Sequence, residues 1–308
     1  MAQSTDDLTP TVKAIYEAYE KRSDDGNRPH LGASIIGKSC DRAIWYTFHW
    51  SSSKKFSGRM LRLFNRGHRE EDRFVADLRS AGVTVYEWDD ERTKKQHSIS
   101  DFNGHFQGSL DGIGIGIKEN PSHWHVLEFK THSAKSFKDL IKNGVKEAKP
   151  EHYSQMQVYM HYKGLEFAYY LAVCKDDDDL HGEVVAYNAP HAQMMINRAE
   201  RIIKANKPPE KISDNPSWFE CKFCDHWDVC HGTKFPKRNC RTCTHSTSLM
   251  DGSWHCDKHK QALSIDDQRE GCSNHLFNPF IVNLPVHDSG SDWVDYKMPD
   301  GTIWRDGK

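Results

Sequence analysis

The ten-residue stretch CKFCDHWDVC, residues 221–230, restricts the fold more than any other part of this sequence. Its cysteines have the spacing C-x2-C-x5-C, and three thiolates rarely complete a metal site, because tetrahedral sites use four ligands. The fourth ligand must come from elsewhere in the chain. Nine cysteines in 308 residues, behind an N-terminus (MAQSTDDLTP) without a secretory pattern, predict metal ligands in a reducing cytoplasm rather than disulfides.

Two pairings of the cysteines are compatible with this spacing. In the first, a zinc ribbon of the form C-x2-C-x15-C-x2-C takes its ligands from Cys221, Cys224, Cys240 and Cys243. This choice leaves Cys40, Cys230, Cys256 and Cys272 without a metal. In the second, residues 221–230 take Cys40 as the fourth ligand, and a separate quartet consists of Cys240, Cys243, Cys256 and Cys272.

The second quartet lies within residues 236–285, a segment poor in aliphatic residues that we expect to need a bound metal to fold. Four cysteines suit a tetrahedral zinc ion. The histidines that could replace one of them are His245, His255, His259 and His275. Cys174 lies in the apolar stretch YYLAVC and is predicted to be a core residue.

Hydrophobic periodicity predicts an α/β fold. Helices are expected at residues 8–21, 33–50, 58–82, 150–164 and 193–206. Strands are expected at residues 83–88, 106–117, 123–132, 166–175 and 182–189. The turn KENPS makes a hairpin of the second and third strands. Helices, a meander, then a helix and two strands indicate a mixed central sheet flanked by helices. No apolar run is long enough to cross a membrane.

Acidic and basic side chains share one face of the strand at residues 123–132. Side chains alternate along a strand, so Glu128 and Lys130 point one way while Leu127 and Phe129 point the other. The hairpin brings Asp111 beside the same face. Two carboxylates can hold a divalent cation such as Mg²⁺, and a neighbouring lysine can position or deprotonate water for attack on a phosphodiester.

These residues and the following QMQVY helix resemble the D…E-x-K…Q-x3-Y array of the RecB-like PD-(D/E)XK nucleases. The resemblance implies that Asp111, Glu128 and the Phe129 carbonyl bind Mg²⁺ or Mn²⁺, and that Lys130 is the catalytic lysine. Gln155 and Tyr159 match the Q-x3-Y pair, one helical turn apart. Gln157 competes for the glutamine position, because QMQ allows two registers.

The stretch NRGHREEDRF resembles the first motif of the same family, a helix that carries a metal-facing residue. Glu71, four residues after Gly67, fits the G-x3-E form of lambda-type phage exonucleases, which makes Glu71 a further catalytic residue. His68 does not match the position of the histidine form. A surface histidine on the helix is the alternative interpretation of His68.

Two segments resemble the iron staple of AddB-type and CRISPR-associated nucleases: SIIGKSCDRAIWY and CKFCDHWDVC. The resemblance implies that a [4Fe–4S] cluster ties the two ends of the nuclease domain together through Cys40, Cys221, Cys224 and Cys230. Zinc on the same residues, or the ribbon pairing, is the alternative. The predicted domains are a helical arm at 1–30, the nuclease domain at 31–235, a zinc module at 236–285 and a tail hairpin at 286–308.

A net charge of −2 means that any DNA-binding surface must be local. Lysines recurring every three or four residues predict a phosphate-binding stripe on one helix face, made of Lys135, Lys138, Lys142, Lys146 and Lys149. Further cationic candidates are Arg42, Arg66, Arg69 and Arg73. The acidic run KDDDDLHGE is expected to lie away from DNA.

The sequence therefore predicts a metal-dependent DNA exonuclease like those of phage recombination, with Mg²⁺ or Mn²⁺, an iron–sulfur cluster and zinc as cofactors. DNA with ends is the expected partner, together with a single-strand-annealing recombinase, in the host cytoplasm if the chain is phage-encoded. A structure-specific endonuclease of CRISPR-adaptation type is an alternative within the same enzyme class. A DNA-binding metalloprotein without catalytic activity is the alternative from another class.

Overall fold

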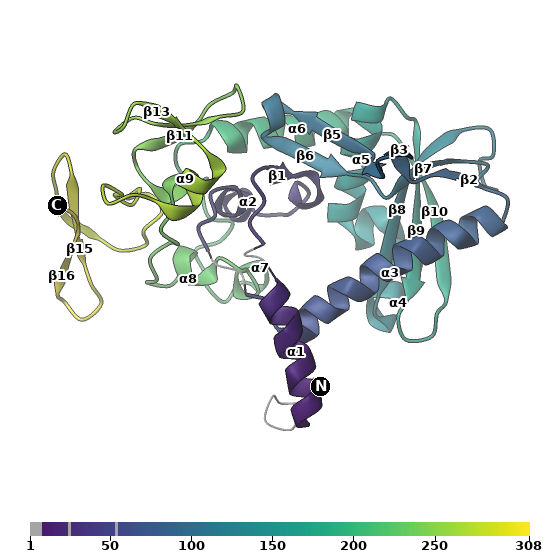
Figure 1. The fold of residues 1–308 in the computed structure, drawn as a ribbon, viewed down its shortest axis with the longest axis horizontal. Helices are drawn as coiled ribbons and strands as arrows, with labels where there is room; N and C mark the ends of the chain where they lie inside the picture. Colours follow the sequence, from purple (N-terminus) through teal and green to yellow (C-terminus); the bar gives the residue numbers. More distant parts are fainter. Residues whose placement is uncertain (1–7, 24–25, 53–54) are drawn as a thin grey trace. The chain divides into compact units, whose positions relative to one another are not determined.

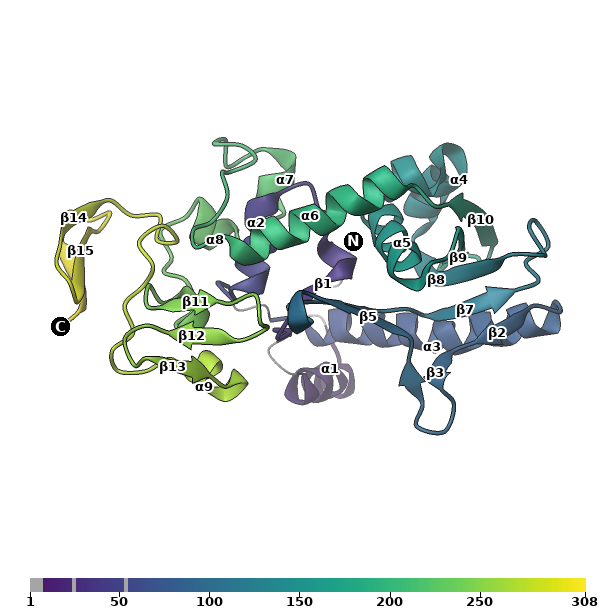
Figure 2. The ribbon, with the colours of Figure 1, turned by 90° about the horizontal axis from the view of Figure 1, so that it is seen from above.

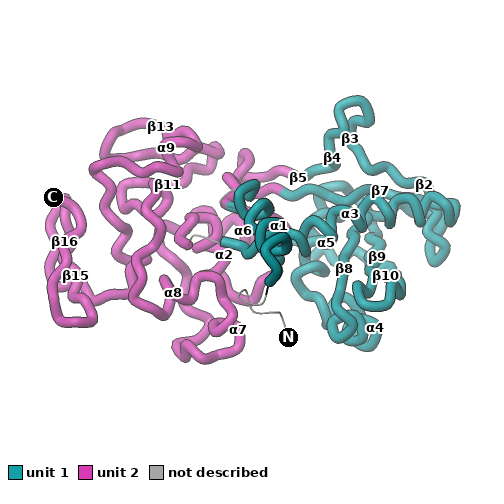
Figure 3. The backbone as a smooth tube through the Cα atoms, turned by 60° about the horizontal axis from the view of Figure 1, so that its bottom comes forward, with its two compact units in different colours: residues 1–26, 54–99, 108–193 teal, residues 27–53, 100–107, 194–308 magenta. Residues whose placement is uncertain are grey.

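The structure is a computed structural model that describes residues 8–23, 26–52 and 55–308. The first seven residues of the stretch MAQSTDDLTP lie outside the described residues. So do residues 24–25, just after the helix predicted at 8–21. The chain forms two compact units, which Figure 3 shows in different colours. Unit 1 contains residues 1–26, 54–99 and 108–193, and unit 2 contains residues 27–53, 100–107 and 194–308.

Unit 1 is built on a five-stranded sheet with the order β10-β9-β8-β7-β2 (Figure 1). The strands are β2 (Thr84–Tyr86), β7 (Gly112–Ile115), β8 (Trp124–His132), β9 (Phe167–Cys174) and β10 (Leu180–Ala186). β8 and β9 are parallel, and the other neighbouring strands are antiparallel. The predicted mixed central sheet and the hairpin of β7 with β8 are therefore confirmed.

Four helices accompany this sheet: α1 (Pro10–Arg22), α3 (Gly58–Ser80), α4 (Ala134–Ala148) and α5 (Pro150–Lys163). Phe74, Val75 and Leu78 of α3 pack on Leu127 and Phe129 of β8, which fills the core on one side of the sheet. The other side is covered by α5, whose residues 153–160 are all buried (Figure 2). Residues i, i+1 and i+4 of α3 share one face, which explains why this helix meets the sheet along one stripe.

The predicted strand at residues 106–117 is wrong as a single element. The chain forms β6 (Phe106–Ser109) and β7 in different sheets, with Leu110 and Asp111 between them. β5 (Ser98–Asp101) and β6 carry the chain from unit 1 into unit 2 and back, and β6 pairs in parallel with β1 (Leu31–Gly32). β3 (Trp88–Asp90) and β4 (Lys95–Gln96) form a separate two-stranded hairpin. The run FQGSLDGIGIGI carries a sign of the break that the prediction missed: its large apolar residues are Phe106 and Leu110 in the first half and Ile113, Ile115 and Ile117 in the second, so the alternation changes phase around Asp111.

Unit 2 combines short helices with two small antiparallel sheets. Its helices are α2 (Asp41–Phe48), most of α6 (Ala189–Lys204), α7 (Phe219–Lys222), α8 (Trp227–Cys230) and α9 (Ile265–Glu270). One sheet contains β11 (Ser246–Ser248), β12 (Trp254–Cys256) and β13 (Gln261–Leu263). The other contains β14 (Val286–Ser289), β15 (Trp293–Lys297) and β16 (Ile303–Gly307), so the predicted tail hairpin has a third strand.

No helix in the described ranges is long and apolar enough to cross a membrane.

Gly58, the first residue of α3, lies where this helix passes closest to α1. The Gly58 N–H donates to Glu20 Oε1 (2.7 Å), and a Cβ at residue 58 would collide with the carbonyl of Tyr16. Replacing Gly58 with Ala is therefore expected to lower the free energy of unfolding by roughly 1–3 kcal/mol. Thermal and urea unfolding measure the change.

Gly67, in the middle of the same helix, provides the matched control. No described atom outside its own helix lies within 4 Å of where its Cβ would stand. Replacing Gly67 with Ala should leave stability unchanged or raise it by up to about 1 kcal/mol, because Ala is the better helix former. Equal losses in both variants would contradict the close approach at Gly58.

Candidate active site

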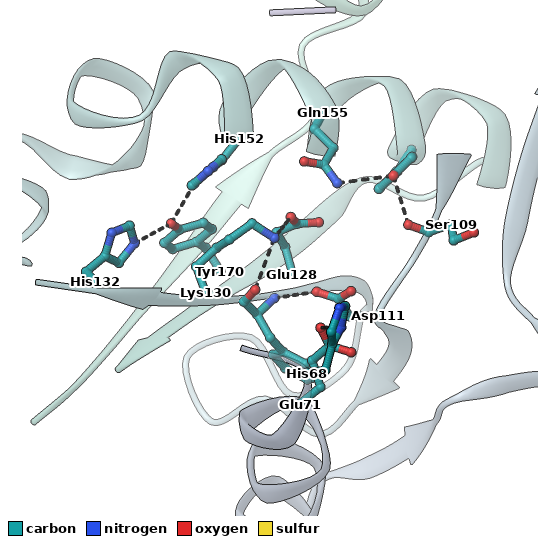
Figure 4. Close-up of polar contacts among 12 residues, drawn as sticks. His68, Glu71, Ser109, Asp111, Glu128, Lys130, His132, His152, Gln155 and Tyr170 are labelled. Carbon is teal, nitrogen blue, oxygen red and sulfur yellow. Dashed lines mark hydrogen bonds and ion pairs between the residues drawn. The ribbon is translucent and has the colours of Figure 1, made fainter. Parts of the chain in front are cut away.

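The strand β8 carries the charged side chains of the candidate site. Glu128 and Lys130 lie on the face toward α5, opposite the core residues Leu127 and Phe129 (Figure 4). Glu128 is 0% exposed. A carboxylate buried to this extent is costly unless a cation or hydrogen-bond donors accompany it. The alternation expected from the sequence thus places an unusual charge inside unit 1.

Asp111 lies in the short connection between β6 and β7. Its Oδ2 accepts a hydrogen bond from the Phe129 N–H (2.7 Å), which fastens the carboxylate to the middle of β8. Gly112 pairs with Leu127 in antiparallel register, so the hairpin sets Asp111 beside Glu128. The juxtaposition expected from the hairpin is present. The break in the predicted strand is what frees the Asp111 side chain from a sheet position.

Glu71 of α3 belongs to the same group of carboxylates (Figure 4). Burial raises the pKa of Glu71, and the charge of Asp111 raises it further, while His68 and Lys130 act in the opposite direction. His68 Nδ1 lies 3.3 Å from Glu71 Oε1, and the His68 side chain is 74% exposed. The structure therefore places Glu71 among the carboxylates and His68 on the outer surface of the helix, as its neighbour.

The electrostatics of Glu128 show a shortage of positive charge. Burial raises the pKa of Glu128 to about 7, and the negative charges of Asp111 and Glu71 add to this effect against the opposing charge of Lys130. Glu128 Oε2 has no hydrogen-bond partner among the described residues. A buried oxygen without a donor next to two further carboxylates fits a place where a hard divalent cation is held by oxygen ligands.

Lys130 supplies the cation nearest to this group. Its Nζ donates to Glu128 Oε1 and to the carbonyl oxygen of Phe129 (3.0 Å). These are two of the oxygen donors that the family resemblance assigns to a metal ion. Across residues 8–23, 26–52 and 55–308, no group of three or more His, Cys, Asp or Glu side chains has an arrangement that could hold a metal ion. The carboxylates are gathered around the ammonium group but not closed around a common point.

The helix α5 contributes Gln155 and Tyr159. Gln155 Nε2 donates to Tyr159 Oη (3.1 Å), and Tyr159 donates to the carbonyl of Ser109 (2.8 Å), the last residue of β6. This chain of bonds holds the connection that contains Asp111. Gln157, the competing glutamine, instead bonds the Ala186 carbonyl and the Asn188 N–H. The structure thus sets Gln155, not Gln157, beside Tyr159.

A hydrogen-bonded group of His132, Tyr170 and His152 was not anticipated from the sequence. Tyr170 Oη lies 2.8 Å from both His132 Nε2 and His152 Nδ1 (Figure 4). Burial lowers the pKa of His132 to about 4 and of His152 to about 3, and the charge of Lys130 contributes to both shifts. Both imidazoles are therefore neutral. The sequence held one signal for His132: side chains alternate along a strand, so residue 132 points to the same face as Glu128 and Lys130.

The predicted lysine stripe is interrupted. Lys135, Lys138 and Lys142 are exposed on α4, but Gly144 has φ 71° and ψ 167°, so the helix is kinked there. Lys146 and Lys149 follow the kink, and Lys149 Nζ lies 3.6 Å from Asp139 Oδ2. One continuous helical stripe through all five lysines is therefore wrong, since the spacing argument assumed regular turns across Gly144.

The cysteines of residues 221–230 gather with Cys40 in unit 2. Cys40 is the N-cap of α2, Cys221 lies in α7, and Cys230 ends α8. Burial raises the pKa of Cys221, Cys224 and Cys230, and the negative charge of Cys40 raises each of them further. Asp41, next to Cys40, pairs with Arg198 and Arg201 of α6. Cys221, Cys224 and Cys230 therefore each lie within electrostatic range of Cys40.

The remaining quartet gathers separately in unit 2. Burial raises the pKa of Cys240 to about 12, and the charges of Cys243, Cys272 and Cys256 contribute. Cys272 Sγ lies 3.6 Å from His259 Nε2, so this candidate histidine touches a cysteine. His275 is buried and bonded to the Asn239 carbonyl (3.1 Å). Four soft donors without a hard oxygen ligand fit zinc by their chemistry.

Arg241 is a buried cation that the sequence did not reveal. It is 2% exposed, and its guanidinium lies 3.7 Å from the ring centre of Trp50 and 4.7 Å from that of Trp254. It donates to the carbonyls of Phe48 and Pro29 and to Gln268 Oε1. Burial lowers the pKa of Arg241 to about 9. Stacked rings and backbone carbonyls thus surround the guanidinium charge. In the sequence, Arg241 directly follows Cys240, the first cysteine of the second quartet.

No protein-family model and no curated protein matches the sequence. The solved structures that are similar to the chain include the following three. One is the protein SSO0001, with 16% identity, a TM-score of 0.42, and coverage of 71% of this chain and 93% of that one. The second is an alkaline exonuclease (LHK-Exo) from Laribacter hongkongensis, with 16% identity, a TM-score of 0.41, and coverage of 60% and 90%. The third, LHK-Exo in complex with dAMP, has 15% identity, a TM-score of 0.41, and coverage of 62% and 90%.

The raised pKa of Glu128 predicts that protons and metal ions compete for this carboxylate. Below about pH 7 Glu128 is protonated, so a divalent cation must displace its proton. Apparent affinity for Mn²⁺ should therefore rise with pH, by up to about tenfold per unit, and level off above about pH 7. Calorimetric titration between about pH 5.5 and 8.5 measures this dependence.

The Glu128→Gln variant is the control for this titration. It carries no proton at residue 128 to displace, so its remaining Mn²⁺ affinity should vary less with pH than that of the wild type. A wild-type affinity that stays constant from about pH 5.5 to 8.5 would contradict the competition.

Proposed function

We propose that this chain is a metal-dependent deoxyribonuclease that hydrolyses phosphodiester bonds, acting as an exonuclease. One observation carries the proposal: Asp111, Glu128 and Lys130 meet at the middle of β8, with the Gln155–Tyr159 pair holding the Asp111 connection from α5. Residues that match the D…E-x-K…Q-x3-Y array are thus drawn together from three separate parts of the chain. A solvated strand with alternating charges would not bury its carboxylate.

Asp111, Glu128 and the Phe129 carbonyl are the groups that would hold Mg²⁺ or Mn²⁺, and Glu71 would face the same ion. When bound, such an ion lowers the pKa of a coordinated water and neutralises charge on the phosphate. The carboxylates have the oxygen donors that this class of ion prefers. The unpartnered Oε2 of Glu128 supports the assignment, because burial leaves that oxygen in need of a positive charge.

Lys130 acts as a fixed cation in this proposal rather than as a base. Burial alone would lower the pKa of Lys130, but the charges of Glu128 and Asp111 outweigh it and the pKa is raised. The lysine is therefore protonated at neutral pH. From its position beside Glu128 it can orient the attacking water and donate a hydrogen bond to the phosphate as negative charge develops.

Gln155 and Tyr159 are positioning residues. Tyr159 donates to the Ser109 carbonyl, so it fixes the connection that carries Asp111. Gln155 in turn bonds the Tyr159 hydroxyl. The pair thus anchors the short connection that carries the Asp111 carboxylate to the buried helix α5.

The two cysteine quartets have structural roles in the proposal. Cys40, Cys221, Cys224 and Cys230 would hold a [4Fe–4S] cluster, because four thiolates from distant segments suit the staple that the resemblance implies. Cys240, Cys243, Cys256 and Cys272 would hold zinc. The proposed substrate is DNA with ends, in phage-type recombination in the cytoplasm beside a single-strand-annealing recombinase, with Lys135, Lys138, Lys142, Lys146 and Lys149 as phosphate contacts.

Replacing Glu128 with Gln tests the proposed nuclease. Cleavage of linear DNA in Mg²⁺ or Mn²⁺ should fall by at least about 100-fold, because the buried anion that would hold the cation is lost. Glu119→Gln, an exposed carboxylate in the turn between β7 and β8, should cleave like the wild type. Gel assays measure the rates, and circular dichroism checks that each variant is folded.

The form of the substrate separates the exonuclease from its alternatives. Linear DNA should be degraded to nucleotides while a closed circular plasmid stays intact. Cleavage of the circle would support the endonuclease instead. DNA binding with no cleavage by the wild type, or unchanged cleavage by Glu128→Gln, would overturn the proposed activity.

Anaerobic purification tests the iron–sulfur cluster. The protein should be brown and contain about four iron and four sulfide ions per chain. Cys40→Ser should lose the iron, whereas Cys174→Ser should keep it, because Cys174 is a buried residue of β9 outside both quartets. Cys256→Ser should lose zinc alone. A colourless protein that contains only zinc would contradict the cluster.

A further inference from the structure

We propose that the groove between α1 and α3 binds a single strand of DNA and leads it toward Glu71. This inference rests on the proposed nuclease and specifies its substrate as an unpaired strand. The groove lies wholly within unit 1 and encloses about 710 Å³. Aromatic, cationic and apolar side chains line it, among them Ile15, Tyr19, Arg22, Phe64, His68 and Arg69.

The groove lies beside the contact between α1 and the first residue of α3. They are in close contact at Gly58, where a side chain would collide with the Tyr16 backbone. Beyond this contact α1 buries none of its residues. Ile15 is 45% exposed and Phe64 is 41% exposed, although both point into the space between the helices. Two helices that packed only for stability would bury these side chains.

The aromatic side chains of the groove are arranged as platforms. Phe64 packs edge to face against Phe56, with ring centres 5.0 Å apart, so its ring is held while one side remains accessible. Tyr19 lies on the opposite helix. Bases of single-stranded nucleic acid stack on such rings in a way that tolerates any sequence, and bases inside a duplex cannot reach them. The rings therefore favour an unpaired strand over a duplex.

The charge of the groove matches a phosphate backbone. The first half of α3, residues 58–69, contains Arg59, Arg62, Arg66 and Arg69 and no acidic residue. Arg22 of α1 and Arg69 of α3 line the groove from its two sides. A protein helix docked here by apolar contacts would press its apolar face on both arginines and remove their water, which is costly.

The groove ends next to the candidate active site. His68 lines the groove and lies 3.3 Å from Glu71 Oε1, and Glu71 interacts electrostatically with Asp111. One helix therefore presents a strand-binding surface along its first half and a site carboxylate one turn later. A strand that follows the groove arrives at the carboxylates that the nuclease proposal uses.

Binding measurements in the Glu128→Gln background test the groove without cleavage. Fluorescence anisotropy with a labelled single-stranded oligonucleotide, and with the same sequence as a blunt duplex, is measured at several salt concentrations. Phe64→Ala should weaken single-strand binding roughly tenfold. Arg69→Gln should reduce the slope of log single-strand affinity against log salt concentration by about 0.7. Duplex affinity should change less in both variants.

Tyr86→Ala and Arg92→Gln are the matched controls. Tyr86 is 45% exposed, close to the exposure of Phe64, and both control residues lie in unit 1 outside the groove. Both should bind single strands like the parent. Unchanged single-strand binding in Phe64→Ala and Arg69→Gln, or equal losses for duplex, would overturn the groove as a single-strand site.

Two further measurements separate the failure of this inference from the failure of the nuclease. Light scattering shows whether Phe64→Ala converts a dimer to a monomer, in which case the groove is an interface between two copies and the inference fails. Cleavage of the same oligonucleotide by otherwise wild-type protein is measured in parallel. If the wild type cleaves normally and the groove variants bind as it does, only the groove proposal is overturned. If the wild type neither binds nor cleaves the oligonucleotide, both proposals are overturned.

Discussion

The arrangement of unit 1 depends on a carboxylate held inside the protein beside two others. Glu128 has no access to water, and Lys130 is the only lysine that the structure bonds to it in the described part of the chain. Other parts of the unit keep this group in place: the parallel pairing of β8 with β9, the Phe129 N–H bond to Asp111, and the Tyr159 bond that holds the connection before β7. Burial strengthens each charge interaction, so small displacements of any partner would alter the pKa values.

Local sequence patterns predicted the strands that carry the Glu128 carboxylate and Lys130. The residues that surround them are brought there by pairing between distant strands. Alternation placed Glu128 and Lys130 on one face, and the KENPS turn predicted the β7–β8 hairpin. The neighbours His132, Tyr170 and His152 meet only because β8 and β9 pair in one particular register, Glu128 against Tyr170, across two intervening helices. The lysine spacing gave no warning of the positive φ of Gly144, which interrupts the helix. The split of residues 106–117 does have a local signal, because the apolar positions change from even (Phe106, Leu110) to odd (Ile113, Ile115) across Asp111.

Unit 2 shows a different way to build a small core. Where aliphatic residues are scarce, indole rings and a guanidinium fill the interior: Arg241 lies between Trp50 and Trp254, and backbone carbonyls receive its N–H groups. Such a core depends on the directions of hydrogen bonds as well as on the volume of its side chains, since each guanidinium N–H needs an acceptor. It also connects residues that are nearly two hundred positions apart in sequence, as the Phe48–Arg241 bond does. Cys40 likewise lies within electrostatic range of the distant cysteines at residues 221–230.

The contact of Lys130 with Glu128 and the Phe129 carbonyl means that an entering cation would compete with a charge of the chain itself. An ion that bound to these oxygens would take hydrogen-bond acceptors from the Lys130 ammonium, which would remain beside Glu128 as a second cation. A monovalent ion would offer the carboxylates no more charge than the ammonium already does. A divalent ion would bring twice that charge to a group of three carboxylates, so electrostatics would favour it. The Lys130 side chain would thus disfavour potassium and sodium before any ligand geometry does.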